Sequence, residues 1–143
     1  MKRLLSILIA GLSLATVTMP AHAEISPDGA IAIAEFDKLE ASMQAIVDIL
    51  AEIQDKQTAD TKAALLAEKI TALQQQMTAM QQLETKLKGI PTEDDKAAFE
   101  ASKNRLHTVG ANLQHELMRL SLVNFYYSET LINTFQKLQG GMR

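Results

Sequence analysis

Apolar residues recur along most of this chain at steps of three and four positions. That spacing places them on one face of a helix. No run alternates apolar and polar residues between turns, so the pattern predicts no strands and favours an all-α protein. The predicted stripes are Phe36, Leu39, Met43, Ile46, Leu50 and Ile53; then Ala63, Leu66, Ile70, Leu73, Met77, Met80 and Leu87; then Phe99, Leu106, Leu113 and Leu120.

Polar and proline-containing breaks divide this pattern into three helical segments, at about 26–54, 58–88 and 92–139. The connections between them are only a few residues long, and short connections make neighbouring helices antiparallel. The heptad-like steps are also typical of coiled-coil seams. We therefore expect an antiparallel three-helix bundle with coiled-coil-like seams.

The ends of these segments carry helix signals. Ser26 is the predicted cap of the first helix, with Pro27 at its first position. Thr58 and Thr92 are the predicted caps of the second and third helices. Gly89 is predicted to take the left-handed conformation that often follows a helix end.

The third segment is too long for its neighbours. It spans about 48 residues against about 29 and 31, so a straight helix would project by roughly 24 Å. The chain could instead bend and return as a short fourth helix capped by Ser128. No glycine or proline forces a turn between 121 and 139, so we expect a C-terminally extended third helix.

The projecting part is apolar and holds four of the six aromatic residues of the chain. An exposed apolar stretch of this size usually marks a contact surface. Antiparallel packing would also place Tyr126 or Tyr127 beside the 55–60 connection. The candidate interaction surface is Phe125, Tyr126, Tyr127, Leu131, Phe135 and Leu138.

The first 23 residues have the three parts of a cleavable signal peptide. Lys2 and Arg3 precede an apolar run, residues 4–17, and Ala21 and Ala23 stand at the positions that signal peptidase requires. The run of about 14 residues is shorter than the roughly 20 of a spanning helix. We expect residues 1–23 to be removed, leaving one domain, residues 24–143, periplasmic or secreted and without a stable membrane anchor.

Composition narrows the function classes. Without Lys2 and Arg3, 12 basic and 17 acidic residues leave a net charge of −5. A mildly acidic domain without a basic cluster argues against binding to nucleic acid or anionic lipid. The chain has no cysteine, which excludes thiol chemistry, cysteine-held metal centres and disulfides.

The remaining candidate sites have structural explanations. His107 and His115 are eight residues apart, about 12 Å along a helix, which is too far for one metal ion. Methionine at core positions is ordinarily a flexible gap-filler. The segment 39–43 is similar to the methionine region of small exported haem cytochromes, but the last 28 residues contain no histidine to serve as second ligand. We therefore predict no enzyme activity and no cofactor.

These observations favour an exported, non-enzymatic protein that acts through helix–helix interaction or oligomerisation. A protein partner or a second copy would cover the apolar C-terminal part. Two alternatives are a small ligand or metal carrier that binds within the bundle, and a holdase chaperone. The chain is similar to exported chaperones of the Skp type in size and helicity, but it lacks their basic charge and strands.

Overall fold

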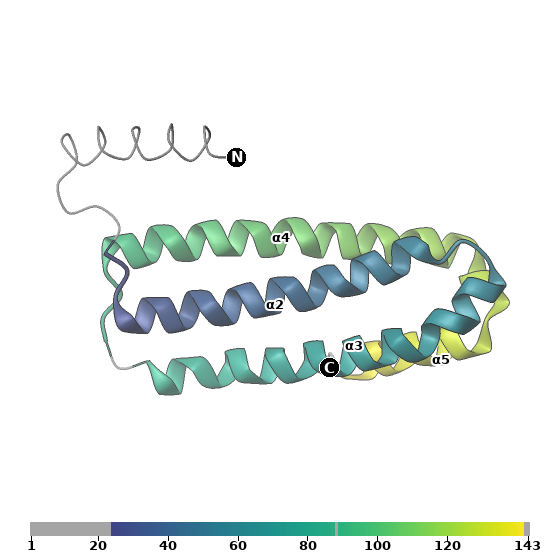
Figure 1. Ribbon diagram of the computed structural model, residues 1–143, viewed down its shortest axis with the longest axis horizontal. Helices are drawn as coiled ribbons and strands as arrows, with labels where there is room; N and C mark the ends of the chain where they lie inside the picture. The colour runs from purple at the N-terminus through teal and green to yellow at the C-terminus, as the bar shows by residue number, and fades with distance from the viewer. Residues whose placement is uncertain (1–23, 88, 142–143) are drawn as a thin grey trace, which may run out of the picture.

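The computed structural model describes residues 24–87 and 89–141, and all of the regular structure in these ranges is helical, as predicted. The predicted signal peptide, residues 1–23, lies outside the described residues. The described helices include none with the length and hydropathy needed to cross a membrane. The elements are α2 (Pro27–Glu52), α3 (Lys56–Lys86), α4 (Glu93–Leu122), the short turn η1 (Asn124–Tyr127) and α5 (Glu129–Gly141) (Figure 1).

Helix α2 lies between α3 and α4 and contacts both (Figure 1). α2 and α4 run in the same direction, and α3 runs in the opposite one. In the described part of the chain, α3 and α4 do not come within 8 Å of each other at Cα. The three long helices therefore alternate in direction along the chain without closing into a bundle in which each packs on both others.

The predicted C-terminal extension of the third helix is wrong. α4 ends at Leu122, and after η1 the chain reverses so that α5 packs against α3 (Figure 1). Four helices pack together in place of the predicted three. The reason is tertiary: α5 buries Leu131 and Phe135, 0% and 5% exposed, against the bundle, and this burial outweighs the local preference for a continuous helix. The coiled-coil-like geometry of the seams stays a prediction.

The main core lies at the end of the bundle where α5 returns. Its members come from all four helices, and most of them are predicted stripe residues. Towards the opposite end, where α5 is absent, stripe residues such as Phe36, Leu39 and Leu106 are only half-buried. The main cluster is Ile46, Ile49, Leu50, Ile53, Ala59, Leu66, Ile70, Leu73, Leu120, Leu131 and Phe135.

The helix ends follow the sequence signals in part. Ser26 and Thr92 cap α2 and α4 as predicted. The cap of α3 is Asp55 and not Thr58, because Asp55 and Thr58 bond each other reciprocally in a capping box. Gly89 was predicted to be left-handed, which is wrong: no described glycine has a positive φ, and α3 ends instead on Leu87 in extended conformation.

One buried carboxylate joins the first turns of α2 and α4. Asp95 is fully buried and accepts hydrogen bonds from the Ser26 backbone N–H at 2.9 Å and the Ser26 hydroxyl at 2.7 Å. It also accepts from the Thr92 backbone N–H at 2.9 Å. The same side chain therefore completes the capping box of α4 and holds the cap residue of α2.

Arg119 fixes the other end of this helix pair. Its guanidinium donates to the carbonyl oxygens of Leu50 at 2.7 Å and Ile53 at 3.1 Å, and to the Glu116 carboxylate at 2.8 Å. The last carbonyls of a helix lack partners within it, and a cation there also complements the helix dipole. The parallel helices α2 and α4 are thus joined at both ends.

The substitution Gly29→Ala is expected to destabilise the protein by about 1–3 kcal/mol, through overpacking. A Cβ at Gly29 would lie 2.1 Å from Asp95 Oδ1, and that carboxylate is fixed by its hydrogen bonds. Helix propensity alone predicts that the substitution stabilises the protein, since alanine is favoured over glycine in a helix. Denaturant unfolding measures the change.

The matched control for this prediction is Gly110→Ala in α4. Its Cβ would meet only Met43 Cε, at an ordinary 3.6 Å, so propensity should dominate and stabilise the protein by about 0.5–1 kcal/mol. Equal effects of the two substitutions would show that Asp95 does not restrict the space at Gly29.

Candidate functional site

The end of the bundle where α5 returns combines a buried contact between α5 and α3, an unusual backbone turn and exposed apolar side chains. At Cα distances of 8 Å or less, α5 lies beside α3 and η1 and no other described element. Leu131 and Phe135 belong to the same buried cluster as Leu66 and Ile70 of α3. The Phe135 ring also packs on the Phe125 ring of η1, with centroids 5.0 Å apart.

The turn η1 has a left-handed backbone. Asn124, Phe125, Tyr126 and Tyr127 have φ values of 47°, 52°, 53° and 57°. For aromatic residues such as Phe125, Tyr126 and Tyr127 this region costs about 1–2 kcal/mol each, because Cβ approaches the following carbonyl oxygen, whereas asparagine tolerates it better. Over the three aromatic residues the turn therefore stores roughly 3 to 6 kcal/mol.

Packing of α5 supplies a stabilisation of similar size. Full burial of an apolar side chain contributes about 1.5–3 kcal/mol, so Leu131 and Phe135 together contribute roughly 3 to 6 kcal/mol. The Phe125–Phe135 ring pair adds about 0.5–1.5 kcal/mol. The folded-back arrangement of α5 is thus a balance between strain in η1 and burial on α3.

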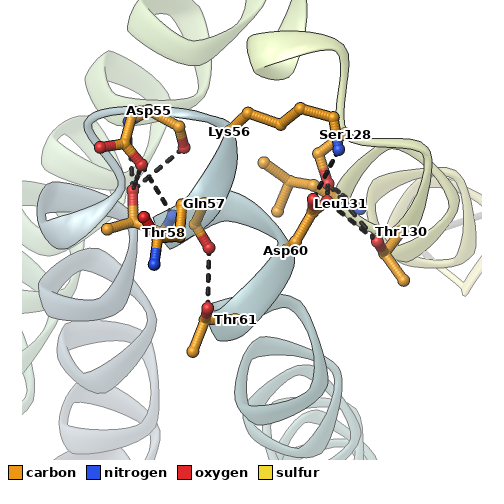
Figure 2. Close-up of polar contacts among 9 residues, drawn as sticks. All are labelled: Asp55, Lys56, Gln57, Thr58, Asp60, Thr61, Ser128, Thr130 and Leu131. Carbon is orange, nitrogen blue, oxygen red and sulfur yellow. Dashed lines mark hydrogen bonds and ion pairs between the residues drawn. The ribbon is translucent and has the colours of Figure 1, made fainter.

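Hydrogen bonds to Asp60 hold the start of α5 against the start of α3. Figure 2 shows Ser128 and Thr130 pointing towards the Asp60 carboxylate. The fully buried Ser128 hydroxyl donates to Asp60 Oδ1 at 2.5 Å, and Thr130 donates to the same oxygen at 3.3 Å. Ser128 also accepts from the Leu131 backbone N–H at 3.2 Å, so it caps α5.

Lys56 completes this cluster from the first turn of α3. Its ammonium lies 2.6 Å from Asp60 Oδ2. The hydrogen bond from Lys56 lowers the pKa of Asp60 below its usual value, and the bond from Ser128 lowers it further. Asp60 is therefore ionised at neutral pH and serves as an acceptor shared by both helices.

Tyr127 stands at the edge of this cluster with 73% of its surface exposed. It lines a shallow depression of about 300 Å³ together with Lys56, Asp60, Glu129 and Thr130. This agrees with the prediction that Tyr126 or Tyr127 lies beside the 55–60 connection. Both segments lie at this end because α3 runs opposite to α2 and α4, which is the antiparallel packing from which the position was expected (Figure 1).

Further apolar side chains are exposed just before the turn. Met118 and Leu122 lie four residues apart on one face of α4 and are 60% and 87% exposed, and Val123 is 39% exposed. We call Met118, Leu122, Val123 and Tyr127 the tip surface. Leu122 was not among the candidate residues from the sequence. The pattern that could have identified it as exposed is that Met118 and Leu122 lie off the stripe through Leu113 and Leu120.

The structure distributes the candidate interaction residues between core and surface. Leu131 and Phe135 are buried within the chain itself, while Phe125 and Tyr126 are half-buried against the same core cluster. Tyr127 is exposed. Leu138 lies in α5, and its side chain is outside the part that the structure describes.

The two histidines of the described residues and Met77 are not part of the tip surface. His107 is exposed on α4, and the side chain of His115 is 79% exposed. Within the described ranges, histidine, aspartate and glutamate form no group of three or more that could hold a metal ion. Met77 lines a depression of about 360 Å³ on α3 with Gln74, Thr78 and Gln81.

No protein family, curated protein or solved structure matches this chain.

Proposed function

We propose that this chain is an exported, non-enzymatic helical protein that acts through helix–helix interaction with a protein partner or with a second copy of itself. The observation that carries the proposal is the tip surface. Its four side chains lie at the end of the bundle where α5 returns, and they are half of the large hydrophobic side chains that are exposed in the described residues. Exposed apolar side chains that gather in one region are typical of a contact surface.

The structure changes which residues a test should alter. Leu131 and Phe135 hold α5 in place, so their substitution would disturb the fold as well as any interface. Leu122 and Tyr127 are 87% and 73% exposed and can be changed without loss of core packing. They are the informative positions for partner binding.

The double substitution Leu122→Ser and Tyr127→Ser is expected to reduce partner capture at least tenfold, by removing exposed apolar area from the interface. The chain starting at Glu24 serves as bait under native conditions, and bound protein is quantified by mass spectrometry. Circular dichroism confirms that the variant keeps its helices.

Ile90→Ser provides the matched control. Ile90 is 92% exposed in the α3–α4 connection, at the opposite end of the bundle from the tip surface (Figure 1). Capture should be unchanged in this variant. Equal capture by the wild-type chain and the double variant, or equal loss in both variants, would count against the tip surface.

A further inference from the structure

The residues of η1 have a second available backbone conformation, the right-handed helix. Between 121 and 139 the sequence contains no glycine or proline, and nothing local prevents a right-handed helix from running through it. All four residues of η1 are nevertheless left-handed. If these residues became helical, the strain would be relieved and α4 would continue directly into α5.

We call the face of α3 around Leu66 and Ile70 the seat of α5. This face can bind an α5 helix from the same chain or from another copy. At Cα distances of 8 Å or less, α5 lies beside α3 and η1 and no other described element, so the backbone packing of α2 on α3 and α4 does not run through α5. Departure of α5 would uncover the face of α3 that holds Leu66 and Ile70. An α5 from another copy would present the same Leu131 and Phe135 to that face.

The helix directions allow this exchange. α3 and α5 begin at the same end of the bundle, where Asp60 meets Ser128, and they run in the same direction, opposite to α4 (Figure 1). If a two-fold axis at this end relates two copies, the α4 helices of the two copies run in opposite directions. In the second copy, α4 and α5 joined as one straight helix would then pass along α3 of the first copy. It would run in the same direction as the α5 that α3 binds in the single chain.

We propose that two copies of this chain exchange α5, with residues 123–128 opening as the hinge and each α5 occupying the seat on α3 of the other copy. The exchanged dimer keeps every contact between α5 and α3 and removes the left-handed turn from both chains. Strained, short hinge segments favour such exchange. This inference rests on the proposed function and names a second copy as the partner.

A matched pair of hinge variants tests the exchange. One carries Asn124→Gly and Tyr127→Gly, and the other carries Asn124→Ala and Tyr127→Ala. Both remove the same two exposed side chains, so they differ only in backbone preference. Glycine accepts a positive φ readily and weakens helices, whereas alanine resists the left-handed region and favours helix.

We expect the alanine variant to dimerise with a dissociation constant lower by about a hundredfold or more than that of the glycine variant. The chain starting at Glu24 contains every helix described and is refolded at a series of concentrations before light scattering with size exclusion. Equal association of both variants, or monomers in both at every concentration, would overturn the exchange.

A second measurement covers the case in which the alanine variant does not fold. The chain has no cysteine, and the side chains of Asp60 and Thr130 meet across the seat. A chain with Asp60→Cys is mixed with a chain carrying Thr130→Cys, refolded and oxidised. Exchange predicts a covalent heterodimer far in excess of the covalent dimer from either chain alone, and equal yields would contradict it.

The two proposals fail separately. If the hinge variants and the cysteine chains show no exchange while Leu122→Ser with Tyr127→Ser still loses its partner, the exchange is wrong and the tip surface binds a different protein. If exchange occurs while capture does not depend on Leu122 and Tyr127, the seat on α3, and not the tip surface, is the interface.

Discussion

Phe135→Ala is expected to lower the free energy of unfolding by about 3–5 kcal/mol, the usual cost of removing a buried phenylalanine. Phe135 is 5% exposed, belongs to the main core cluster and packs on Phe125. Its loss removes much of the burial that balances the strain in η1. We therefore expect α5 to detach from α3 before the three long helices separate.

Two measurements distinguish this detachment from global unfolding. Urea unfolding followed by circular dichroism gives the total loss of stability, and limited proteolysis reports opening of residues 123–128. The variant should be cleaved there under conditions in which the wild-type chain is resistant. Cleavage spread evenly over all connections would show that α5 is not an independently released unit.

Phe99→Ala is the control for this prediction. Phe99 also packs on another ring, that of Phe36, with centroids 6.3 Å apart, but it is half-buried and lies at the opposite end of the bundle. Because less burial is lost, we expect a destabilisation of about 1–2 kcal/mol. Protease resistance at residues 123–128 should be unchanged.

Asp95→Asn is expected to lower the melting temperature by several degrees at neutral pH and to abolish one part of the acid sensitivity of the fold. The carboxylate accepts from Ser26 and from the Thr92 backbone. An amide offers one acceptor oxygen, and its NH₂ group would face donors. Both α2 and α4 would then lose part of their N-terminal capping.

The pH dependence follows from the direction of the pKa shift. Hydrogen bonds from Ser26 and then from Thr92 lower the pKa of Asp95 below its ordinary value. A carboxyl with a lowered folded-state pKa stabilises the fold above its unfolded-state value, near 3.9, and this stabilisation is lost as the pH falls through the folded-state value. Melting temperatures should therefore fall more steeply below about pH 4 in the wild-type chain than in Asp95→Asn.

Glu93→Gln serves as the control for the acid titration. Glu93 lies in the same first turn of α4, but it is exposed and pairs with Lys96 at the surface. Its substitution should leave the slope of melting temperature against pH below 4 close to that of the wild-type chain. Parallel slopes for wild type and Asp95→Asn would instead show that Asp95 does not control acid stability.

The sequence predicted the features that depend on neighbouring residues. The helices and the caps at Ser26 and Thr92 are local signals, and the structure has them. The predicted stripes are buried mainly where α5 returns, whereas Met77 is exposed and Phe36 and Leu106 are half-buried. The chain reversal at 123–128 was not predicted because its cause is not local. Burial of Leu131 and Phe135 against α3 drives it, and these residues are separated from their partners by some 60 positions in the sequence.

Asp95 shows the same limit at a single residue. From the sequence, the acids at 93–95 are three partners for the helix dipole. Only the fold separates Asp95 from the others, because Ser26, 69 positions away, supplies two of its donors. Of the tip surface, Tyr127 was among the candidate interaction residues, whereas Leu122 was not.

The joined ends of α2 and α4 also determine when the fold can form. The bonds of Asp95 to Ser26 and of Arg119 to Leu50 and Ile53 each span 66 to 69 positions. Contacts between residues so far apart in sequence slow folding, since a long loop must close before they form. As the chain is made, α2 and α3 can pair early as a hairpin. Helix α4, which has the larger contact with α2, is complete only when the chain extends past Arg119. Folding of this small helical protein is therefore completed late, and more slowly than its helix content alone would suggest.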